Sequence, residues 1–206
     1  MKKICLIICA VLCVFVTACS SAPKVTRVDA GTQVDFSGRW NDSDVRMVCE
    51  SLIESATSSP RIDAFIRDFS ARNRGALPTV IVGRFDNKSS EHIDTDIITR
   101  IMRTAIINSG KLEFVEGGNT REALRAERDD QQLNASDRTA ASLGNETAAN
   151  FMLSGVVNSM EEKVDNKTVR AYFVEATLIN IETNGILWAG ENNDIKKVVR
   201  QPKVKL

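Results

Sequence analysis

The spacing of the apolar residues changes near residue 150, and this change constrains the possible fold more than any other feature of the sequence. Up to that point the apolar residues recur mainly every three or four positions, which is typical of amphipathic helices. Beyond it the pattern becomes that of strands, over residues 151–160, 168–181 and 186–194. Asp165-Asn166 and Asn184-Gly185 separate these segments, and Asn-Gly favours a type I′ turn with two positive φ angles. The sequence therefore predicts a C-terminal antiparallel β-meander.

Three amphipathic helices and two strands are expected ahead of the meander. The helical patterns cover residues 41–56, 59–72 and 89–111, and the strand patterns cover residues 79–85 and 112–115. The first helix has Asn41 or Asp42 as its N-cap, and the second has Ser59 as its cap with Pro60 at the first helical position. Gly110 stands where a left-handed C-terminal cap is expected.

Two further helices are predicted between the second strand and the meander. Residues 120–133 have helical propensity but only two large apolar side chains, Leu124 and Leu133, so this helix should be exposed. Residues 136–150 form a second helical segment of small residues. The order of elements predicts an α+β fold with a mostly antiparallel sheet and helices packed mainly on one face. We expect residues 37–199 to form a single domain, followed by a tail at 200–206.

The N-terminus has the pattern of an export signal, predicted over residues 1–18. Two lysines precede an apolar run at 4–16, which is too short to span about 30 Å of hydrocarbon as a helix. The stretch Val16-Thr17-Ala18-Cys19 resembles a bacterial lipobox, which implies cleavage before Cys19 and a lipid on its thiol. Residues 19–36 would then be the lipidated cysteine and a short flexible tether. The alternative is an ordinary cleaved signal in which Cys19 is incidental.

Charge and cysteine content limit the classes of protein that the chain can belong to. The 27 basic side chains, two of them in the predicted signal, nearly balance the 27 acidic ones. The surface therefore lacks the positive excess that nucleic-acid binding requires. Cys49 would be the only unmodified cysteine after cleavage and lipidation, so the mature chain can form no intrachain disulfide.

The sequence contains no recognisable catalytic or metal-binding motif. His92 is the single histidine, which excludes a multi-histidine metal cluster, and its place near a helix start favours an exposed, structurally neutral role. Cys49 falls on the apolar side of the first helix, which favours a small buried hydrophobe over a nucleophile. Neither a Gly-x-Ser-x-Gly elbow, a Walker loop nor a dinucleotide fingerprint is present. We therefore expect no enzyme activity, no cofactor, no metal and no small-molecule substrate.

Four stretches of the sequence together carry a resemblance to a known family. They read SGRWNDSD (37–44), VIVGRFDNKSSEHIDTDIITRIMRTAIINSGKLEFVE (80–116), AANFMLSGVV (148–157) and YFVEATLINIETNGILWAGE (172–191). In this order they resemble the LpoB group, bacterial outer-membrane lipoproteins that activate penicillin-binding proteins. The last stretch also resembles TolB-amino-terminal and curli-secretion domains, whereas SGRWNDSD points to the activator group. The resemblance implies the α+β fold of these domains.

The function that this resemblance implies is regulation through protein–protein contact. The domain, anchored to the outer membrane by lipid and facing the periplasm, would bind a bifunctional penicillin-binding protein, which is a peptidoglycan synthase. Binding would raise the output of the synthase allosterically. The alternative is a structural or secretion-accessory envelope lipoprotein of the curli type, for which a large ring is expected.

No motif marks the docking surface, so the candidate contacts follow from expected exposure alone. One group lies at the end of the first predicted strand, and the other lies on the charged helix that follows the second. The candidate residues are Asn87, Lys88, Ser89, Arg121, Arg125 and Arg128. Ordinary solvated surface is the alternative interpretation for both groups.

Overall fold

The computed structural model describes residues 26–29, 31–35 and 37–201. The chain divides into two units, Met1–Thr32 and Gln33–Leu206, and every helix and strand named below belongs to the second unit. The predicted signal segment and Cys19 lie outside the described residues. Within those residues, no helix combines the length and the apolar character needed to cross a membrane.

In the described part of the chain, four helices accompany a mixed sheet of six strands. In chain order the elements are α2 (Asp42–Thr57), α3 (Pro60–Arg72), β1 (Thr79–Asn87), α4 (Thr95–Ser109), β2 (Glu113–Phe114), α5 (Gly118–Asn134), β3 (Phe151–Val164), β4 (Lys167–Asn180), β5 (Ile186–Asn192) and β6 (Lys196–Arg200). The predicted α+β class, with its meander at the C-terminal end, is confirmed.

The long hairpin formed by β3 and β4 is the spine of the sheet. The two strands pair over their whole length, from Phe151 opposite Asn180 to Val164 opposite Lys167. β5 pairs with the C-terminal half of β4 and β6 with its N-terminal half, both antiparallel. On the other side of β3 lies β1, which runs parallel to β3 and also to β2 at the edge. The strand order is therefore β2-β1-β3-β4-β5, with β6 beside β4.

Alternation along the hairpin gives the sheet two unlike faces. The helical face buries Phe151, Leu153 and Val157 of β3 and Thr168, Tyr172, Val174, Ala176 and Leu178 of β4. The open face carries the alternate positions of both strands, and not one of these positions is buried. They are Met152, Ser154, Val156, Asn158, Met160, Glu162 and Val164 of β3 and Lys167, Val169, Ala171, Phe173, Glu175, Thr177 and Ile179 of β4.

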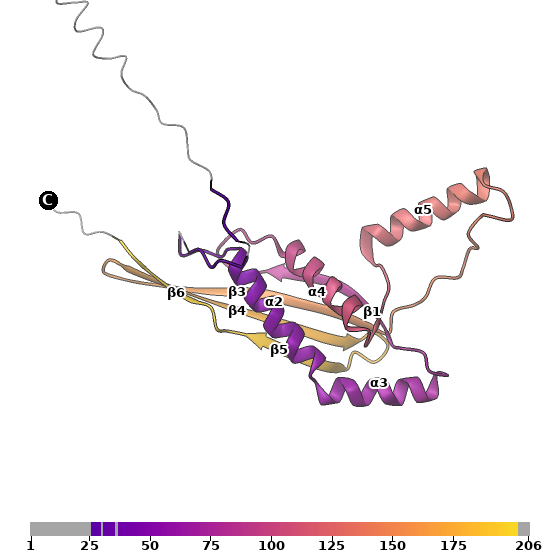
Figure 1. Cartoon of the computed structure of the whole chain (residues 1–206), viewed down its shortest axis with the longest axis horizontal. Helices are drawn as coiled ribbons and strands as arrows, with labels where there is room; N and C mark the ends of the chain where they lie inside the picture. Colours follow the sequence, from indigo (N-terminus) through magenta and orange to yellow (C-terminus); the bar gives the residue numbers. More distant parts are fainter. Residues whose placement is uncertain (1–25, 30, 36, 202–206) are drawn as a thin grey trace, which may run out of the picture. The chain divides into compact units, whose positions relative to one another are not determined.

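Helices α2 and α4 lie side by side across the helical face (Figure 1). Their buried large side chains include Val48 and Leu52 of α2 and Ile98 and Met102 of α4. Each pair is four residues apart and therefore falls on one side of its helix, which is the side turned to the sheet. α3 contacts β5, and its Phe65 packs edge-on against Phe151 with ring centroids 5.0 Å apart. The helices that pack on the sheet thus share one face, as predicted.

The predicted caps at Asn41, Ser59 and Gly110 are confirmed, whereas the helix predicted over residues 89–111 begins later, at Thr95. The Asn41 side chain accepts hydrogen bonds from the backbone amides of Ser43 and Asp44, while the Asp44 carboxylate accepts one from the amide of Asn41. This reciprocal capping box satisfies amides that the first helical turn leaves without partners. Ser59 caps α3 ahead of Pro60, and Gly110 ends α4 in the left-handed conformation with φ 62°.

The prediction of a helix over residues 136–150 is wrong, because this segment consists of turns and irregular chain. Its polar side chains bond locally, as between the hydroxyls of Ser136 and Thr139, which are 2.7 Å apart. Gly144 has φ 77°, which interrupts any helix. Small residues also offer little apolar surface to bury, so propensity alone does not hold such a helix.

The turn between β4 and β5 is in the predicted place but not of the predicted type. Asn184 has φ 58°, whereas the φ of Gly185 is not positive, so the two positive angles of a type I′ turn are not met. Instead, the Asn180 side chain accepts hydrogen bonds from the amides of Glu182 and Thr183 and shapes a longer loop. Strand β6 was not predicted from the sequence.

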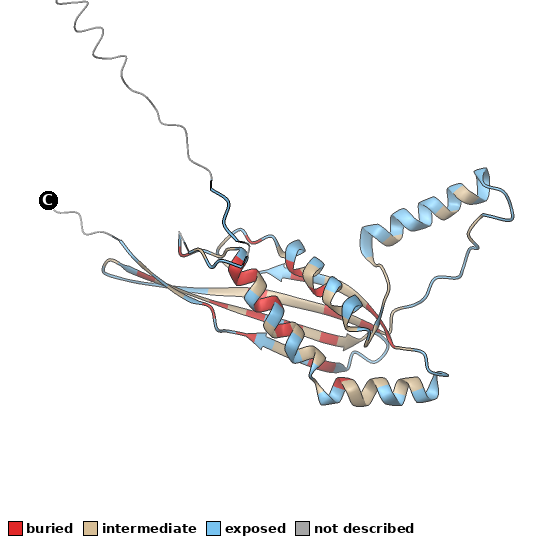
Figure 2. Ribbon diagram, viewed as in Figure 1, coloured by how far each residue is buried: buried red, intermediate tan, exposed pale blue. Residues whose placement is uncertain are grey.

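α5 is exposed, as predicted. None of the residues of α5 is buried, and all of them are exposed or of intermediate exposure (Figure 2). Leu133 has 83% of its surface exposed. The helix therefore contributes no side chain to the core of the domain.

The packing between β1 and β3 can be tested by a substitution at Gly155. A Cβ at this position would overlap the Phe85 ring and the backbone carbonyl of Glu175. We expect Gly155→Ala to lower the free energy of unfolding by roughly 1–3 kcal/mol, measured by thermal or denaturant unfolding. Gly185→Ala is the control, because its nearest neighbour would be the Thr183 hydroxyl at 3.2 Å. Equal stability of the two variants would contradict the packing described here.

Candidate functional site

The carboxylate of Glu91, whose side chain is 11% exposed, joins three separate parts of the chain on the helical face. Its Oε2 accepts a hydrogen bond from the backbone amide of Trp40, and its Oε1 accepts one from the Tyr172 hydroxyl, each at 3.0 Å. The Arg170 guanidinium lies 3.4 Å from the same carboxylate and forms a 2.6 Å ion pair with Glu161. Burial, followed by the hydrogen bond to Glu91, raises the pKa of Tyr172 above its usual value, so the hydroxyl remains a donor.

Lys197 of β6 forms a second polar centre beside the first. Its ammonium donates to the carboxylates of Asp35 and Asp44, each at 2.6 Å, and to the backbone carbonyl of Arg39 at 2.9 Å. Burial works against the charged ammonium, but the two carboxylates outweigh it and the pKa of Lys197 is raised. The hydrogen bond from Lys197 also lowers the pKa of Asp35. Asp35, predicted to belong to the tether, thus contacts the domain.

Gly38 completes this attachment of the N-terminal segment. Its φ of 65° lies in the left-handed region, and a Cβ there would overlap the Val199 side chain. Its carbonyl accepts a 3.3 Å hydrogen bond from Arg170. The Trp40 ring packs edge-on against Tyr172, with centroids 5.2 Å apart. The stretch SGRWNDSD therefore has a structural role, which is to fix the chain ahead of α2 onto β4 and β6.

Asn87, Lys88 and Ser89, the first group of predicted contacts, form the turn after β1. The Asn87 Oδ1 accepts from the amide and the hydroxyl of Ser89, and its Nδ2 donates to the carbonyl of Glu91. The backbone amide of Lys88 donates to Val157 of β3, while its side chain is exposed. The two polar side chains are therefore engaged in local structure, and Lys88 presents its charge to solvent.

The second group of predicted contacts, Arg121, Arg125 and Arg128, lies along one side of α5. Arg125 forms a bidentate pair with Glu146 at 2.9 Å for both contacts, and Arg128 approaches the same carboxylate at 2.5 Å. The hydrogen bond from Arg125 lowers the pKa of Glu146 to about 2. Any stability that the ion pairs of Glu146 add is present at neutral pH and is lost as the pH falls toward 2. Arg121 donates to the backbone carbonyl of Glu116.

The structure does not bring the two predicted groups together. Asn87 ends β1, whereas β2, which leads into α5, pairs with Thr79 and Val80 at the beginning of β1. The polar centres at Glu91 and Lys197 were missed by the sequence reasoning. A signal for them exists in β4, because Arg170 occupies an inward position of an otherwise buried alternation.

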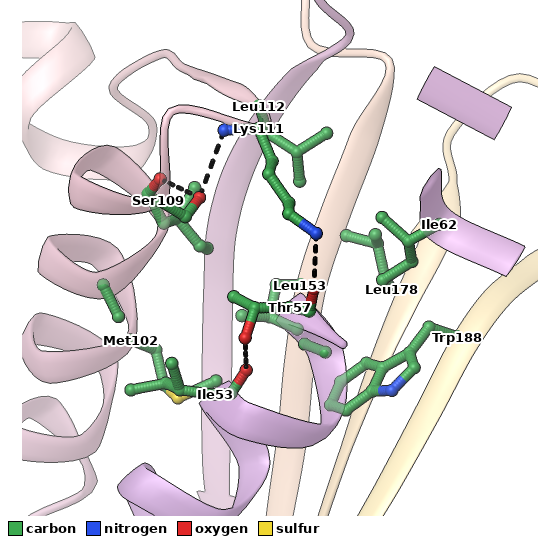
Figure 3. Close-up of a pocket in the computed structure, with 13 residues that line it drawn as sticks. Ile53, Thr57, Ile62, Met102, Ser109, Lys111, Leu112, Leu153, Leu178 and Trp188 are labelled. Atoms are coloured by element: carbon green, nitrogen blue, oxygen red, sulfur yellow. Dashed lines mark hydrogen bonds between the residues drawn. The ribbon is translucent and has the colours of Figure 1, made fainter. Parts of the chain in front are cut away.

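An apolar cavity of about 50 Å³ lies between the helices and the sheet (Figure 3). Its wall includes Ile53, Met102, Leu178 and Trp188, and Lys111 crosses its mouth. The Lys111 ammonium bonds the Thr57 carbonyl and pairs with Asp63 at 2.7 Å. A cavity of this size holds no drug-sized or cofactor-sized molecule, which needs several hundred Å³. We interpret it as imperfect packing of the core.

A shallow groove of about 280 Å³ runs between α2 and α4, with Trp40, Val45 and Ile97 among its lining residues. The Trp40 Nε1 is buried and has no hydrogen-bond partner within the described residues. His92, at the groove edge, is exposed as predicted. Cys49 is fully buried, and burial raises the pKa of its thiol to about 12, so it behaves as the predicted hydrophobe.

These features define an α+β domain with one helix-covered sheet face, one open face and a polar network that fixes its N-terminal segment. A family model described as "Peptidoglycan-synthase activator LpoB" matches residues 44–193, which is most of the chain. The chain belongs to this family, and the resemblance seen in its sequence is confirmed.

Solved structures that match the chain include the LpoB C-terminal domain from Salmonella enterica. It is 16% identical, with 77% of this chain and 99% of that chain covered and a TM-score of 0.41. For the same domain from Escherichia coli the identity is 19%, the coverage 66% and 96%, and the TM-score 0.34. For lipoprotein GNA1162 from Neisseria meningitidis these values are 16%, 62% and 88%, and 0.34. No curated protein sequence matches the chain.

Lys197→Met tests the polar network. The change would leave the Asp44 carboxylate, whose side chain is only 3% exposed, without its cation. We expect a loss of about 3 kcal/mol in the free energy of unfolding, because breaking a buried pair strands a charge. Lys163→Met is the control, since the Lys163 side chain is 69% exposed and should contribute almost nothing. Similar denaturation midpoints for both variants would show that the network does not stabilise the fold.

Proposed function

We propose that this chain is a lipid-anchored protein of the bacterial outer membrane that binds a peptidoglycan synthase of the penicillin-binding type and activates it. The observation that carries the proposal is the match of residues 44–193 to the family of peptidoglycan-synthase activators. The proposal includes the domain organisation expected from the sequence, with a signal at 1–18, a lipidated Cys19 and tether to 36, a domain at 37–199 and a tail at 200–206.

Activation by contact has a defined energetic requirement. The activator must bind the productive conformation of the synthase more tightly than the resting one, because equal affinity for both shifts no equilibrium. A tenfold gain in the productive population needs only about 1.4 kcal/mol of differential affinity. A few well-placed contacts on a rigid surface supply this amount. The packed helices and sheet of this domain provide such a surface.

The proposal is tested by capturing partners of the mature chain from a detergent-solubilised envelope. We expect a synthase that carries a labelled penicillin to be retained on the immobilised chain and to be absent from a column without it. Retention of unrelated envelope proteins alone, under mild conditions, would contradict the proposal. A large ring in a measurement of molar mass would instead favour the curli-type alternative.

Lipid anchoring is tested separately with Cys19→Ala. We expect the substitution to abolish incorporation of labelled fatty acid and to move the protein from the membrane fraction to the soluble fraction, because the thiol that carries the lipid is removed. Cys49→Ala is the control, since that thiol is buried in the domain and should not affect labelling. Undiminished labelling of the Cys19→Ala variant would contradict lipidation at this residue.

A further inference from the structure

The open face of the sheet exposes several large apolar side chains. Met160 of β3, Val198 of β6 and Ile186 of β5 have 65%, 54% and 51% of their surfaces exposed. Val198 lies opposite Val169, and Ile186 lies opposite Ile179, so both belong to the open face. The three helices that contact strands make their buried contacts on the helical face. Large apolar side chains exposed on a sheet face that no helix covers are candidates for contact with a partner.

A row of carboxylates crosses the middle of this face. Glu175 of β4 lies directly opposite Glu191 of β5, and both are exposed. Val156 separates Glu175 from Asp86 of β1 in the same row. Like charges at directly opposed positions destabilise a strand pair. Asp86 has a cation, Arg84, at 3.0 Å, but within residues 37–201 no ion pair includes Glu175 or Glu191. The two glutamates therefore repel each other in the free protein.

The rows on either side of the carboxylates carry mainly apolar or small side chains. Toward one end of the sheet the next row is small, with Ser154, Thr177 and Ala189, and the row after it is large and apolar, with Met152, Ile179 and Ile186. Toward the other end the next row pairs Asn158 with Phe173, and the row after it pairs Met160 with Ala171. The small row leaves room for close approach beside the negative charge. A complementary surface would carry a cation at its centre and apolar side chains around it.

We propose that the open face is the surface that docks on the synthase, and that the partner presents an arginine or lysine, flanked by apolar side chains, between Glu175 and Glu191. This inference rests on the proposed function and adds to it the surface and the chemistry of the contact. Charge complementarity selects a partner protein over a second copy of this chain. In a two-fold dimer through this face the acidic row would face its own copy, and the repulsion would grow.

The test compares the mature chain with its Glu175→Gln/Glu191→Gln variant in binding to the purified penicillin-binding synthase. We expect the variant to unfold at the same temperature or higher, because the repulsion is removed, and to bind about tenfold more weakly or worse. A purely structural role for the pair would not separate binding from stability in this way. Glu54→Gln/Glu182→Gln is the control, with the same change in charge at two exposed glutamates off the open face, and should bind as the unaltered chain does.

The outcomes separate this inference from the proposed function. Unchanged affinity of the Glu175→Gln/Glu191→Gln variant would overturn the docking surface while leaving the synthase as partner. Failure of the unaltered chain to bind the synthase would overturn both. A dimer in light scattering that Met160→Ser converts to a monomer would assign the open face to a second copy, and the inference would be wrong. Met160 is suited to this test because it is largely exposed and its loss costs the core nothing.

Discussion

The continuous pairing of β3 with β4 organises the sheet and decides which side chains are buried. Fourteen residues of each strand are paired without a break, so side chains alternate between two faces along the whole hairpin. β1 pairs with β3, β5 and β6 pair with β4, and β2 joins the sheet through β1. The helices α2, α3 and α4 contact the sheet through β1, β2 and β5. A slip of one residue would exchange the buried and exposed sets, so the buried Tyr172 and Val174 hold the register. The same alternation that builds the core produces the open face.

The polar network holds the N-terminal segment on the domain, because this segment has little apolar surface of its own. Glu91 lies between β1 and α4, Arg170 on β4 and Lys197 on β6, and each bonds to the chain at or just ahead of the start of α2. Buried charges add modest net stability, but they penalise any arrangement that leaves one of them unpaired. The network therefore favours one position for the chain that enters α2. Two rigid layers and a fixed entry point make a domain suited to act through its surface.

Much of this fold follows from local patterns, and the failures have physical causes. Apolar periodicity located α2, α4 and the long hairpin, because their buried residues recur at the period of the element. The helix predicted over residues 136–150 does not form, because helical propensity without an apolar stripe does not outweigh local hydrogen bonds. β6 was not predicted because Lys197 and Arg200 give this segment a polar sequence, and because its strand conformation depends on pairing with β4. The candidate contact surface was harder to predict than the fold. Expected exposure pointed to Asn87 and Arg125. The row of carboxylates on the open face can be recognised only from the strand register, which sets Glu175 opposite Glu191.

Activation by contact, as proposed for this domain, is measured by the rate at which a purified penicillin-binding synthase polymerises and cross-links peptidoglycan, with and without a saturating amount of the mature chain. We expect a higher rate in the presence of the chain and no peptidoglycan synthesis by the chain alone. An unchanged rate while binding is demonstrated, or synthesis by the isolated chain, would show that the domain does not act in this way.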